Sequence, residues 1–270
     1  MTPASKSVAL PNGVELSYVE QGEPSGLPML LLHGVSDSWR SFKPVLPHVP
    51  ASLHTFALSQ RGHGDSGRPA AGYDPHAFAA DLAAFMDALG LGSAVIVGHS
   101  MGTGVAQCFV LDHPGRVVGL VLAASFFAGW RGSPAAVDLW DSVISTLTDP
   151  IDPSFVREFQ ESTLARPVPP AFLEAIVRES LKAPARVWRA VFESFLEADF
   201  SAQLGEIKTP TLIVWGDQDA ICPRSEQEAL AAAIAGAQLV VYSDAGHALH
   251  WEEPEGFAAD LVAFAERLGG

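Results

Sequence analysis

Residues 94–102 read Ala94-Val95-Ile96-Val97-Gly98-His99-Ser100-Met101-Gly102. The first four are apolar and predict a strand buried on both faces, and residues 101–112 predict a helix that ends before Pro114. A serine with glycines two positions away, between a strand and a helix, is typical of a nucleophile elbow. Both glycines are needed because the strand and the helix pass closely at such a strained turn. The first amides of the new helix would face negative charge that develops beside Ser100.

Strands and helices alternate on both sides of this turn. Further strands are predicted at 14–19, 29–32, 53–58, 117–123, 211–215 and 238–242, and further helices at 224–235 and 255–268. Asp74 is predicted to cap a helix that starts at Pro75 and ends at Gly90. This alternation indicates an α/β fold, in which a mostly parallel sheet is covered by helices on both faces.

The alternation stops between about residue 129 and residue 205. Four helices are predicted there instead, with prolines between them, at 135–147, 153–164, 170–181 and 185–198. Ligands bind beyond the carboxyl ends of the strands in an open α/β sheet, and a segment inserted between two strands would cover that edge. We therefore expect a core of residues 1–128 and 206–270 and a helical cap of residues 129–205.

Composition limits the classes of partner. The 270 residues include 16 basic and 31 acidic side chains, a formal net charge of −15. Nucleic-acid backbones and anionic membranes need a basic face, so neither is expected as a partner. Hydrophobic residues make up 48% and charged residues 17%, which indicates a folded globular protein. The uncharged run 88–111 contains glycines and polar residues and is not expected to span a membrane.

The two cysteines, Cys108 and Cys222, provide neither a disulfide framework nor the paired spacing of a zinc site. We expect reduced thiols. The first ten residues lack a basic segment and a long apolar run, so no signal peptide is expected. These features predict a cytoplasmic protein, monomeric or homodimeric, that uses neither a metal nor another cofactor.

A serine nucleophile needs a base, and the base needs an acid that orients it. His247 follows the last predicted strand and so falls at the same sheet edge as Ser100, whereas its rival His250 lies nearer the following helix. Asp217 and Asp219 follow another buried strand at that edge. The candidate triad is therefore Ser100, His247 and one of these two aspartates.

The stretch His33-Gly34-Val35, here called the oxyanion loop, follows the strand 29–32. The backbone amides of Val35 and Met101 would converge on the oxyanion of a tetrahedral intermediate. One such donor is worth about 3 kcal/mol in the transition state. His33 itself is expected to support the loop rather than to act as a base.

The chain resembles the α/β-hydrolase superfamily, in its branch of capped serine esterases, lactonases and C–C hydrolases. The matching residues span almost the whole chain except the cap, and they are His33-Gly34, Arg61-Gly62-His63-Gly64-Asp65-Ser66, Gly98-His99-Ser100-Met101-Gly102, Gly216-Asp217-Gln218-Asp219 and Gly246-His247. The resemblance implies a sheet of about eight strands and the chain order nucleophile, acid, base. It also implies that Asp219 rather than Asp217 belongs to the triad.

The chain departs from its relatives at a few positions. Epoxide hydrolases and haloalkane dehalogenases of the superfamily use an aspartate nucleophile, and Ser100 argues against both activities. Thr103 stands where many relatives carry another glycine, and Ser59-Gln60 stands where an aspartate is common before the Arg-Gly turn. Neither of these two departures touches the triad.

Aromatic side chains dominate the stretches expected to face Ser100. We expect six of them to contact the substrate: Trp39, Phe126, Phe127, Trp130, Trp188 and Phe192. The cap also carries Arg131, Arg186 and Arg189, which could bind a carboxylate but are expected to be solvated. This composition favours an uncharged, moderately hydrophobic acyl compound.

These features predict a serine hydrolase of carboxylic esters or lactones that works through an acyl-enzyme. Its partner would be the small-molecule substrate. Three alternatives stay open. The first is hydrolysis of a C–C bond in a vinylogous diketo acid, which needs a cationic clamp for the acid. The others are cofactor-free perhydrolase chemistry and a small-molecule receptor of the same fold with slow turnover.

Overall fold

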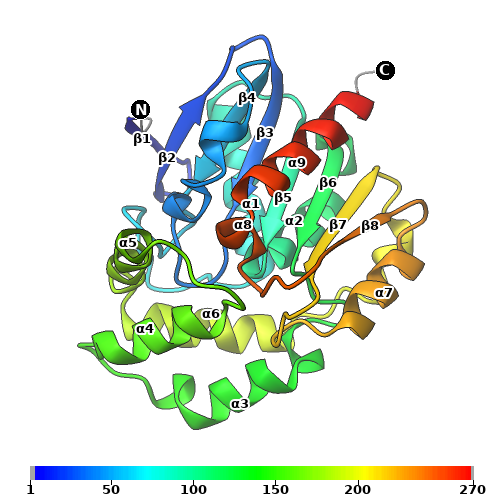
Figure 1. Cartoon of the computed structure of the whole chain (residues 1–270). Helices are drawn as coiled ribbons and strands as arrows, with labels where there is room; N and C mark the ends of the chain where they lie inside the picture. Colours follow the sequence, from blue (N-terminus) through cyan, green and yellow to red (C-terminus); the bar gives the residue numbers. More distant parts are fainter. Residues whose placement is uncertain (1–3, 269–270) are drawn as a thin grey trace.

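An eight-stranded sheet forms the centre of the protein, as seen in a computed structural model that describes residues 4–268 (Figure 1). Its strands are β1 (Ser5–Ala9), β2 (Glu15–Gln21), β3 (Leu27–Leu32), β4 (Leu53–Leu58), β5 (Ala94–His99), β6 (Val117–Ala123), β7 (Thr211–Gly216) and β8 (Gln238–Tyr242). Their spatial order is β1-β2-β4-β3-β5-β6-β7-β8. The β1–β2 and β2–β4 pairs are antiparallel and the other pairs are parallel. The predicted α/β fold with about eight mostly parallel strands is confirmed.

Helices connect most of the strands. The helices are α1 (Pro75–Ala88), α2 (Met101–Asp112), α3 (Pro134–Ser142), α4 (Pro153–Ser162), α5 (Pro170–Ser180), α6 (Ala185–Glu197), α7 (Arg224–Ala233), α8 (Leu249–Glu252) and α9 (Pro254–Leu268). Short 3-10 turns lie at Trp39–Phe42, Leu46–His48, Pro114–Arg116, Trp130–Gly132, Ile144–Thr146 and Leu204–Glu206. Asp74 caps α1 as predicted, because its carboxylate accepts the Ala77 N–H at 3.1 Å.

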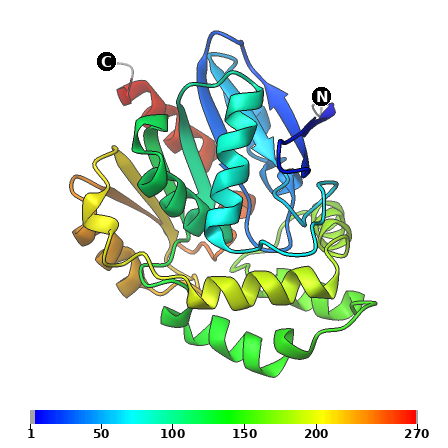
Figure 2. The same ribbon diagram turned by 180° about the vertical axis from the view of Figure 1, so that it is seen from behind.

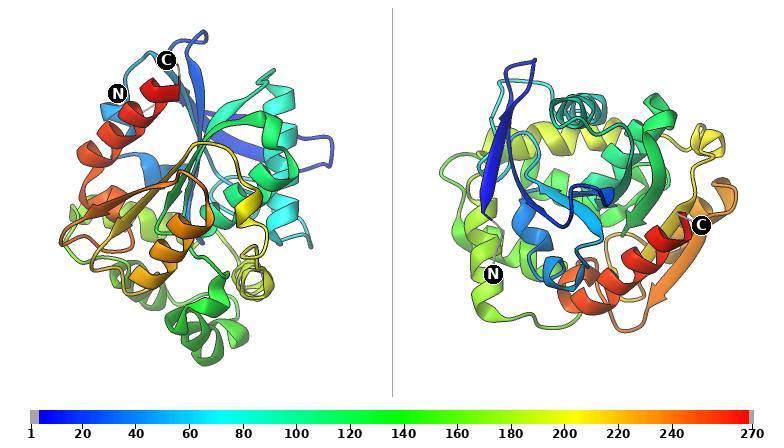
Figure 3. Two further views of the ribbon diagram at one scale, coloured as in Figure 1. Left: turned by 90° about the vertical axis from the view of Figure 1, so that its right-hand side faces the viewer. Right: turned by 90° about the horizontal axis from the view of Figure 1, so that it is seen from above.

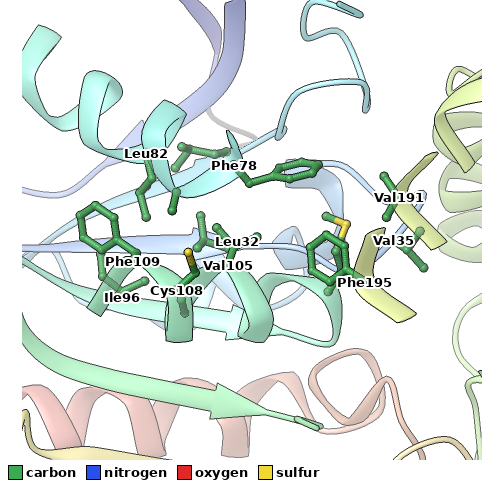
Figure 4. Packing of buried hydrophobic residues seen from close by; sticks show 14 of the residues in the cluster. Leu32, Val35, Phe78, Leu82, Ile96, Val105, Cys108, Phe109, Val191 and Phe195 are labelled. Carbon is green, nitrogen blue, oxygen red and sulfur yellow. The ribbon is translucent and has the colours of Figure 1, made fainter. Parts of the chain in front are cut away.

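The inner strands of the sheet are buried on both faces, and successive side chains of β3 alternate between two cores. Leu30 and Leu32 belong to the core beneath α1 and α2, whereas Met29 and Leu31 belong to the core beneath α9. Figure 3 shows these helices on opposite sides of the sheet, and Figure 4 shows α1 and α2 residues packed around Leu32 in the first core. Because both faces are covered, functional groups can reach solvent or substrate only at the ends of the strands.

The helical segment between β6 and β7 contains α3, α4, α5 and α6. These four helices lie together at one end of the sheet, and α6 runs across that end (Figures 1 and 2). All four fall within residues 129–205, the range predicted to form a cap. In residues 4–268, no helix has the length and apolar character needed to cross a membrane.

Three local features differ from the sequence predictions. β1 was not predicted because its side chains are mostly exposed and show no apolar alternation. The short helix α8 was likewise not predicted. The helix predicted at 135–147 ends at Ser142, whose hydroxyl donates to the Asp138 carbonyl at 2.6 Å, and a 3-10 turn follows.

Candidate active site

Ser100 occupies a strained turn between β5 and α2. Its φ of 51° and ψ of −116° are rarely adopted by a residue with a side chain. A Cβ on Gly98 would lie 2.4 Å from the Gly102 carbonyl oxygen, and a Cβ on Gly102 would lie 2.2 Å from that of Leu32. Glycine is therefore required at both positions, as predicted. Two hydrogen bonds fix the turn. The Ser100 N–H donates to the Ala123 carbonyl, and the Ser100 carbonyl accepts from the Thr103 hydroxyl.

Asp219 and His247 form a buried pair at the carboxyl ends of the adjacent strands β7 and β8. Nδ1 of His247 lies 2.9 Å from Oδ2 of Asp219. Oδ1 of Asp219 accepts the N–H groups of Ile221 and Cys222, both at 2.8 Å, so the carboxylate cannot rotate freely. A carboxylate can only accept hydrogen bonds, so Nδ1 carries the imidazole proton. Nε2 of His247 is then free to accept a proton, and His247 and Ser100 line the same pocket.

The rivals of these two residues have different hydrogen-bond partners. Asp217 is exposed, and its Oδ1 accepts the Asp244 N–H at 2.8 Å. His250 is buried with its Nε2 2.9 Å from the Ser41 hydroxyl. Burial, together with the neighbouring histidines, holds the pKa of His250 well below its ordinary value. The structure thus favours Asp219 over Asp217 and His247 over His250.

His99 supports the loop that carries His247. Its Nε2 donates to the His247 carbonyl at 3.0 Å, and its ring packs against His250. Burial, together with the nearby His247, lowers the pKa of His99 to about 3. His99 therefore stays neutral and keeps this donor role across the physiological pH range.

The oxyanion loop is held rigidly next to Ser100. Nδ1 of His33 donates to the Gly34 carbonyl at 2.7 Å, and its Nε2 accepts the Gln60 N–H at 2.9 Å. A Cβ on Gly34 would lie 3.2 Å from Cβ of Ser100, which shows how closely the loop passes the serine. Met101 begins α2, so its N–H has no partner within the helix. Val35 lines the pocket. Convergence of the two amides on an oxyanion stays a prediction.

The pocket above Ser100 lies between the sheet edge and the helical segment. Most of its wall is apolar, and the large side chains in it are Phe126, Trp130, Leu139, Phe159, Phe192 and Trp251. Among residues 4–268, no lysine or arginine lines it. Arg131 instead pairs with Glu197 at the surface, and Arg186 and Arg189 donate to backbone carbonyls. The described part of the pocket wall therefore offers no cationic partner for a carboxylate.

Three of the six aromatic residues predicted to contact substrate line the pocket, namely Phe126, Trp130 and Phe192. The other three do not. Trp39 is buried in the core beneath α9, because its 3-10 turn directs the side chain toward the sheet. Trp188 packs against Phe155 and Phe159 within the helical segment. Phe127 lies beside the first core, and its N–H is bound by Glu226.

Asp37 is a pocket residue that the sequence analysis did not single out. It follows Val35 by two positions, and its side chain is buried, with an exposed fraction of 3%. Burial raises the pKa of Asp37 to about 8, although hydrogen bonds from Ser41 and Gln160 oppose the shift. The signal that could have revealed it is an acidic residue within a loop already assigned to the site.

Histidine, cysteine and aspartate atoms that could hold a metal meet within 4.8 Å at two places in residues 4–268: Asp219 with Cys222 and His247, and His76 with Cys108 and Asp112. Hydrogen bonds already join the members of each group. Burial raises the pKa of both thiols, so neither is a ready thiolate ligand. Cysteine spacing along the chain could not reveal either group, because His76 and Cys108 come from different helices.

Comparisons with known proteins identify the family of the chain. The model of the alpha/beta hydrolase fold family matches residues 28–254. The chain belongs to the α/β-hydrolase fold family. Similar members include the non-heme haloperoxidase of Rhodococcus erythropolis, 28% identical over 96% of this chain and 98% of that protein. The pimeloyl-acyl-carrier-protein methyl ester esterase of Neisseria meningitidis serogroup B is also 28% identical, over 87% of this chain and 92% of that protein.

A solved structure of this α/β-hydrolase family has the same architecture. The esterase of Exiguobacterium antarcticum superposes on this chain with a TM-score of 0.87 and 26% identity, covering 97% of this chain and all of that one. The relatives thus include esterases and a haloperoxidase. Their shared fold leaves the substrate to the residues of each pocket.

Proposed function

We propose that this α/β hydrolase is a serine hydrolase of carboxylic esters or lactones. The observation that carries the proposal is the buried His247–Asp219 pair, 2.9 Å apart, in the same pocket as a serine held at a strained turn. A serine hydroxyl is a weak nucleophile until an adjacent base accepts its proton. Here the pair supplies the base and the acid that orients it.

The reaction follows from these roles. Nε2 of His247 takes the Ser100 proton as Oγ bonds to the acyl carbon, and Asp219 stabilises the imidazolium. The amides of Val35 and Met101 stabilise the oxyanion, and His247 then gives the proton to the leaving alkoxide. Water, activated by His247, attacks the acyl-enzyme and releases the acid and free Ser100. In a lactone the leaving alkoxide stays attached to the acyl group.

The substrate class follows from the pocket wall. Its large side chains are apolar, and no lysine or arginine among residues 4–268 lines it. This favours an uncharged, moderately hydrophobic ester or lactone over a diketo acid, which would bring a carboxylate without a partner. The helical segment supplies Trp130, Leu139, Phe159 and Phe192 to this wall, so we infer that it acts as a cap over the substrate.

A second candidate is cofactor-free perhydrolysis, in which hydrogen peroxide replaces water and the acyl-enzyme yields a peracid. It is supported by the similarity to a protein named as a non-heme haloperoxidase, which spans nearly the full length of both chains. The same acyl-enzyme serves both reactions. Addition of hydrogen peroxide to a working ester assay separates them, because only perhydrolysis produces an oxidant that brominates a dye in the presence of bromide.

The test measures hydrolysis of a panel of substrates, namely uncharged esters of increasing acyl length and several lactones. A pH indicator detects the protons that hydrolysis releases. We expect turnover that is highest for a medium-length, uncharged acyl group and much lower for a substrate with a carboxylate on the acyl chain. If the protein is folded by circular dichroism but turns over no member of the panel, the proposal is overturned and a receptor role is favoured.

A further inference from the structure

Asp37 is an acid in the pocket wall that the proposed mechanism does not use. It belongs to the segment that connects β3 to the 3-10 turn at Trp39–Phe42, and it faces α4 of the helical segment. None of the salt bridges within residues 4–268 includes it. A buried carboxylate without a cationic partner is costly, so the position needs an explanation.

The neighbour of one carboxyl oxygen is Ser41, whose hydroxyl lies 3.2 Å from Oδ2 of Asp37. The same hydroxyl accepts the indole N–H of Trp251 at 3.0 Å and lies 2.9 Å from Nε2 of His250. Nδ1 of His250 is buried with no partner in the described structure. In a neutral imidazole, a buried N–H without an acceptor costs more free energy than an unprotonated nitrogen without a donor. The proton of His250 therefore sits on Nε2 and points at Ser41. Ser41 thus accepts two bonds and gives its own hydrogen to Asp37.

The neighbour of the other oxygen is Gln160 of α4, whose Nε2 lies 3.2 Å from Oδ1 of Asp37. The same nitrogen lies 2.9 Å from the hydroxyl of Ser180. Ser180 donates its hydrogen to the Ile176 carbonyl at 3.0 Å, so it must accept from Gln160. This fixes the orientation of the amide, whose two N–H groups face Asp37, Ser180 and the Ser36 hydroxyl, which lies 3.1 Å from the same nitrogen.

Both neighbours of Asp37 are therefore donors. Burial without a cation favours the neutral acid, and its pKa of about 8 lies above neutral pH. The hydroxyl hydrogen of that acid finds no acceptor among the polar partners in residues 4–268. The remaining direction open to it is the pocket, which Asp37 lines together with Ser100 and Val35. A neutral carboxylic acid in an apolar site is a strong donor toward a substrate oxygen.

We propose that Asp37 is the donor of a substrate-binding subsite that takes an uncharged ether, carbonyl or hydroxyl oxygen of the substrate. The subsite lies between the oxyanion loop and α4, so this oxygen belongs to a part of the substrate outside the scissile ester group. The inference rests on the proposed function, since it narrows the class to esters or lactones that carry a further oxygen. Asp37 is a binding residue in this account and takes no part in bond cleavage.

Other titratable groups near Asp37 have been assigned different partners. His250 of α8 points at Ser41, and His99 binds the His247 carbonyl. Arg40 and Glu179, on the flanking turn and on α5, pair with each other at 3.1 Å. The proposed triad serves every ester in the assay, so the experiment must cancel the pH dependence of the shared reaction.

The test compares two esters with the same leaving group and the same acyl length, p-nitrophenyl methoxyacetate and p-nitrophenyl butanoate, which differ by an ether oxygen in place of a methylene. The measured quantity is the ratio of their kcat/KM values from about pH 6 to about pH 10. Both esters use the same triad, so the pH dependence of the shared bond-breaking steps cancels in the ratio. We expect the ratio to fall about tenfold as pH rises through about 8, because ionised Asp37 no longer donates.

Substitutions of Asp37 test whether its carboxylic acid is the donor to the substrate oxygen. Asp37→Leu should lower the ratio about tenfold at neutral pH, and Asp37→Asn, which cannot ionise, should make the ratio independent of pH. Asp141→Asn on the exposed face of α3 is the matched control and should keep the wild-type profile. Circular dichroism checks each fold, and the wild-type pH series needs no variant at all.

The outcomes are distinguishable. Wild-type protein that hydrolyses neither ester contradicts the proposed function. If the protein hydrolyses both esters but the ratio of their kcat/KM values is the same at every pH and in Asp37→Leu, the subsite is overturned and the proposed function is not.

Discussion

Replacing Ser100 with alanine is expected to lower kcat on the best ester by about 10⁶-fold, because the oxygen that forms the acyl bond is removed. The fold should persist, since the strained backbone of residue 100 is set by the flanking strand and helix, and alanine adds no atoms. Steady-state kinetics measure the loss, and thermal unfolding checks the fold.

Ser162→Ala is the matched control for this substitution. Ser162 lines the same pocket, but its hydroxyl donates to the Phe159 carbonyl at 2.7 Å and is not free to attack a substrate. Its loss should change kcat by less than about tenfold. Equal losses in both variants, or wild-type turnover in Ser100→Ala, would show that Ser100 is not the nucleophile.

Asp219→Asn is expected to lower kcat by about 10⁴-fold with a smaller change in KM. The asparagine amide would donate toward Nδ1 of His247 and so move the imidazole proton to Nε2. The base would then face Ser100 with the wrong nitrogen protonated. The measurement is kcat and KM on the best ester of the panel.

Asp217→Asn, two positions away in the same loop, is the control for that experiment. Asp217 is exposed, and within residues 4–268 its carboxylate accepts hydrogen bonds from the Asp244 N–H and the neighbouring Gln218 side chain, so its amide variant should stay within a few fold of wild type. The reverse pattern, with the large loss at Asp217, would show that Asp217 rather than Asp219 is the acid of the triad.

The sequence contained most of the candidate triad because each member lies in a local context with a strict physical requirement. Gly98 and Gly102 flank Ser100 because no Cβ fits at either position. Asp219 and His247 could be paired before the structure was known because both follow strands whose carboxyl ends share one sheet edge. β7 and β8 prove to be neighbours in register. The choice of Asp219 over Asp217 came only from the family resemblance, and the hydrogen bonds now support it.

The pocket wall was harder to predict because side-chain direction depends on tertiary packing. Trp39 and Trp188 are large aromatic residues of the kind that often contact a substrate. Each is nevertheless directed into a core by the turn or helix that carries it. Asp37 and Gln160 meet across 123 positions of sequence, so no local pattern connects them. Their contact exists only because α4 packs against the connection that follows β3.

The central claim is a covalent acyl-enzyme on Ser100, and covalent labelling tests it most directly. The protein is treated with an uncharged alkyl fluorophosphonate, which reacts with a serine that an adjacent base activates. Intact mass and peptide mapping then locate the adduct. The account predicts one adduct per chain, on Ser100, which forms far more slowly in Asp219→Asn than in Asp217→Asn. An adduct on another residue, or unlabelled protein that still hydrolyses esters, would contradict it.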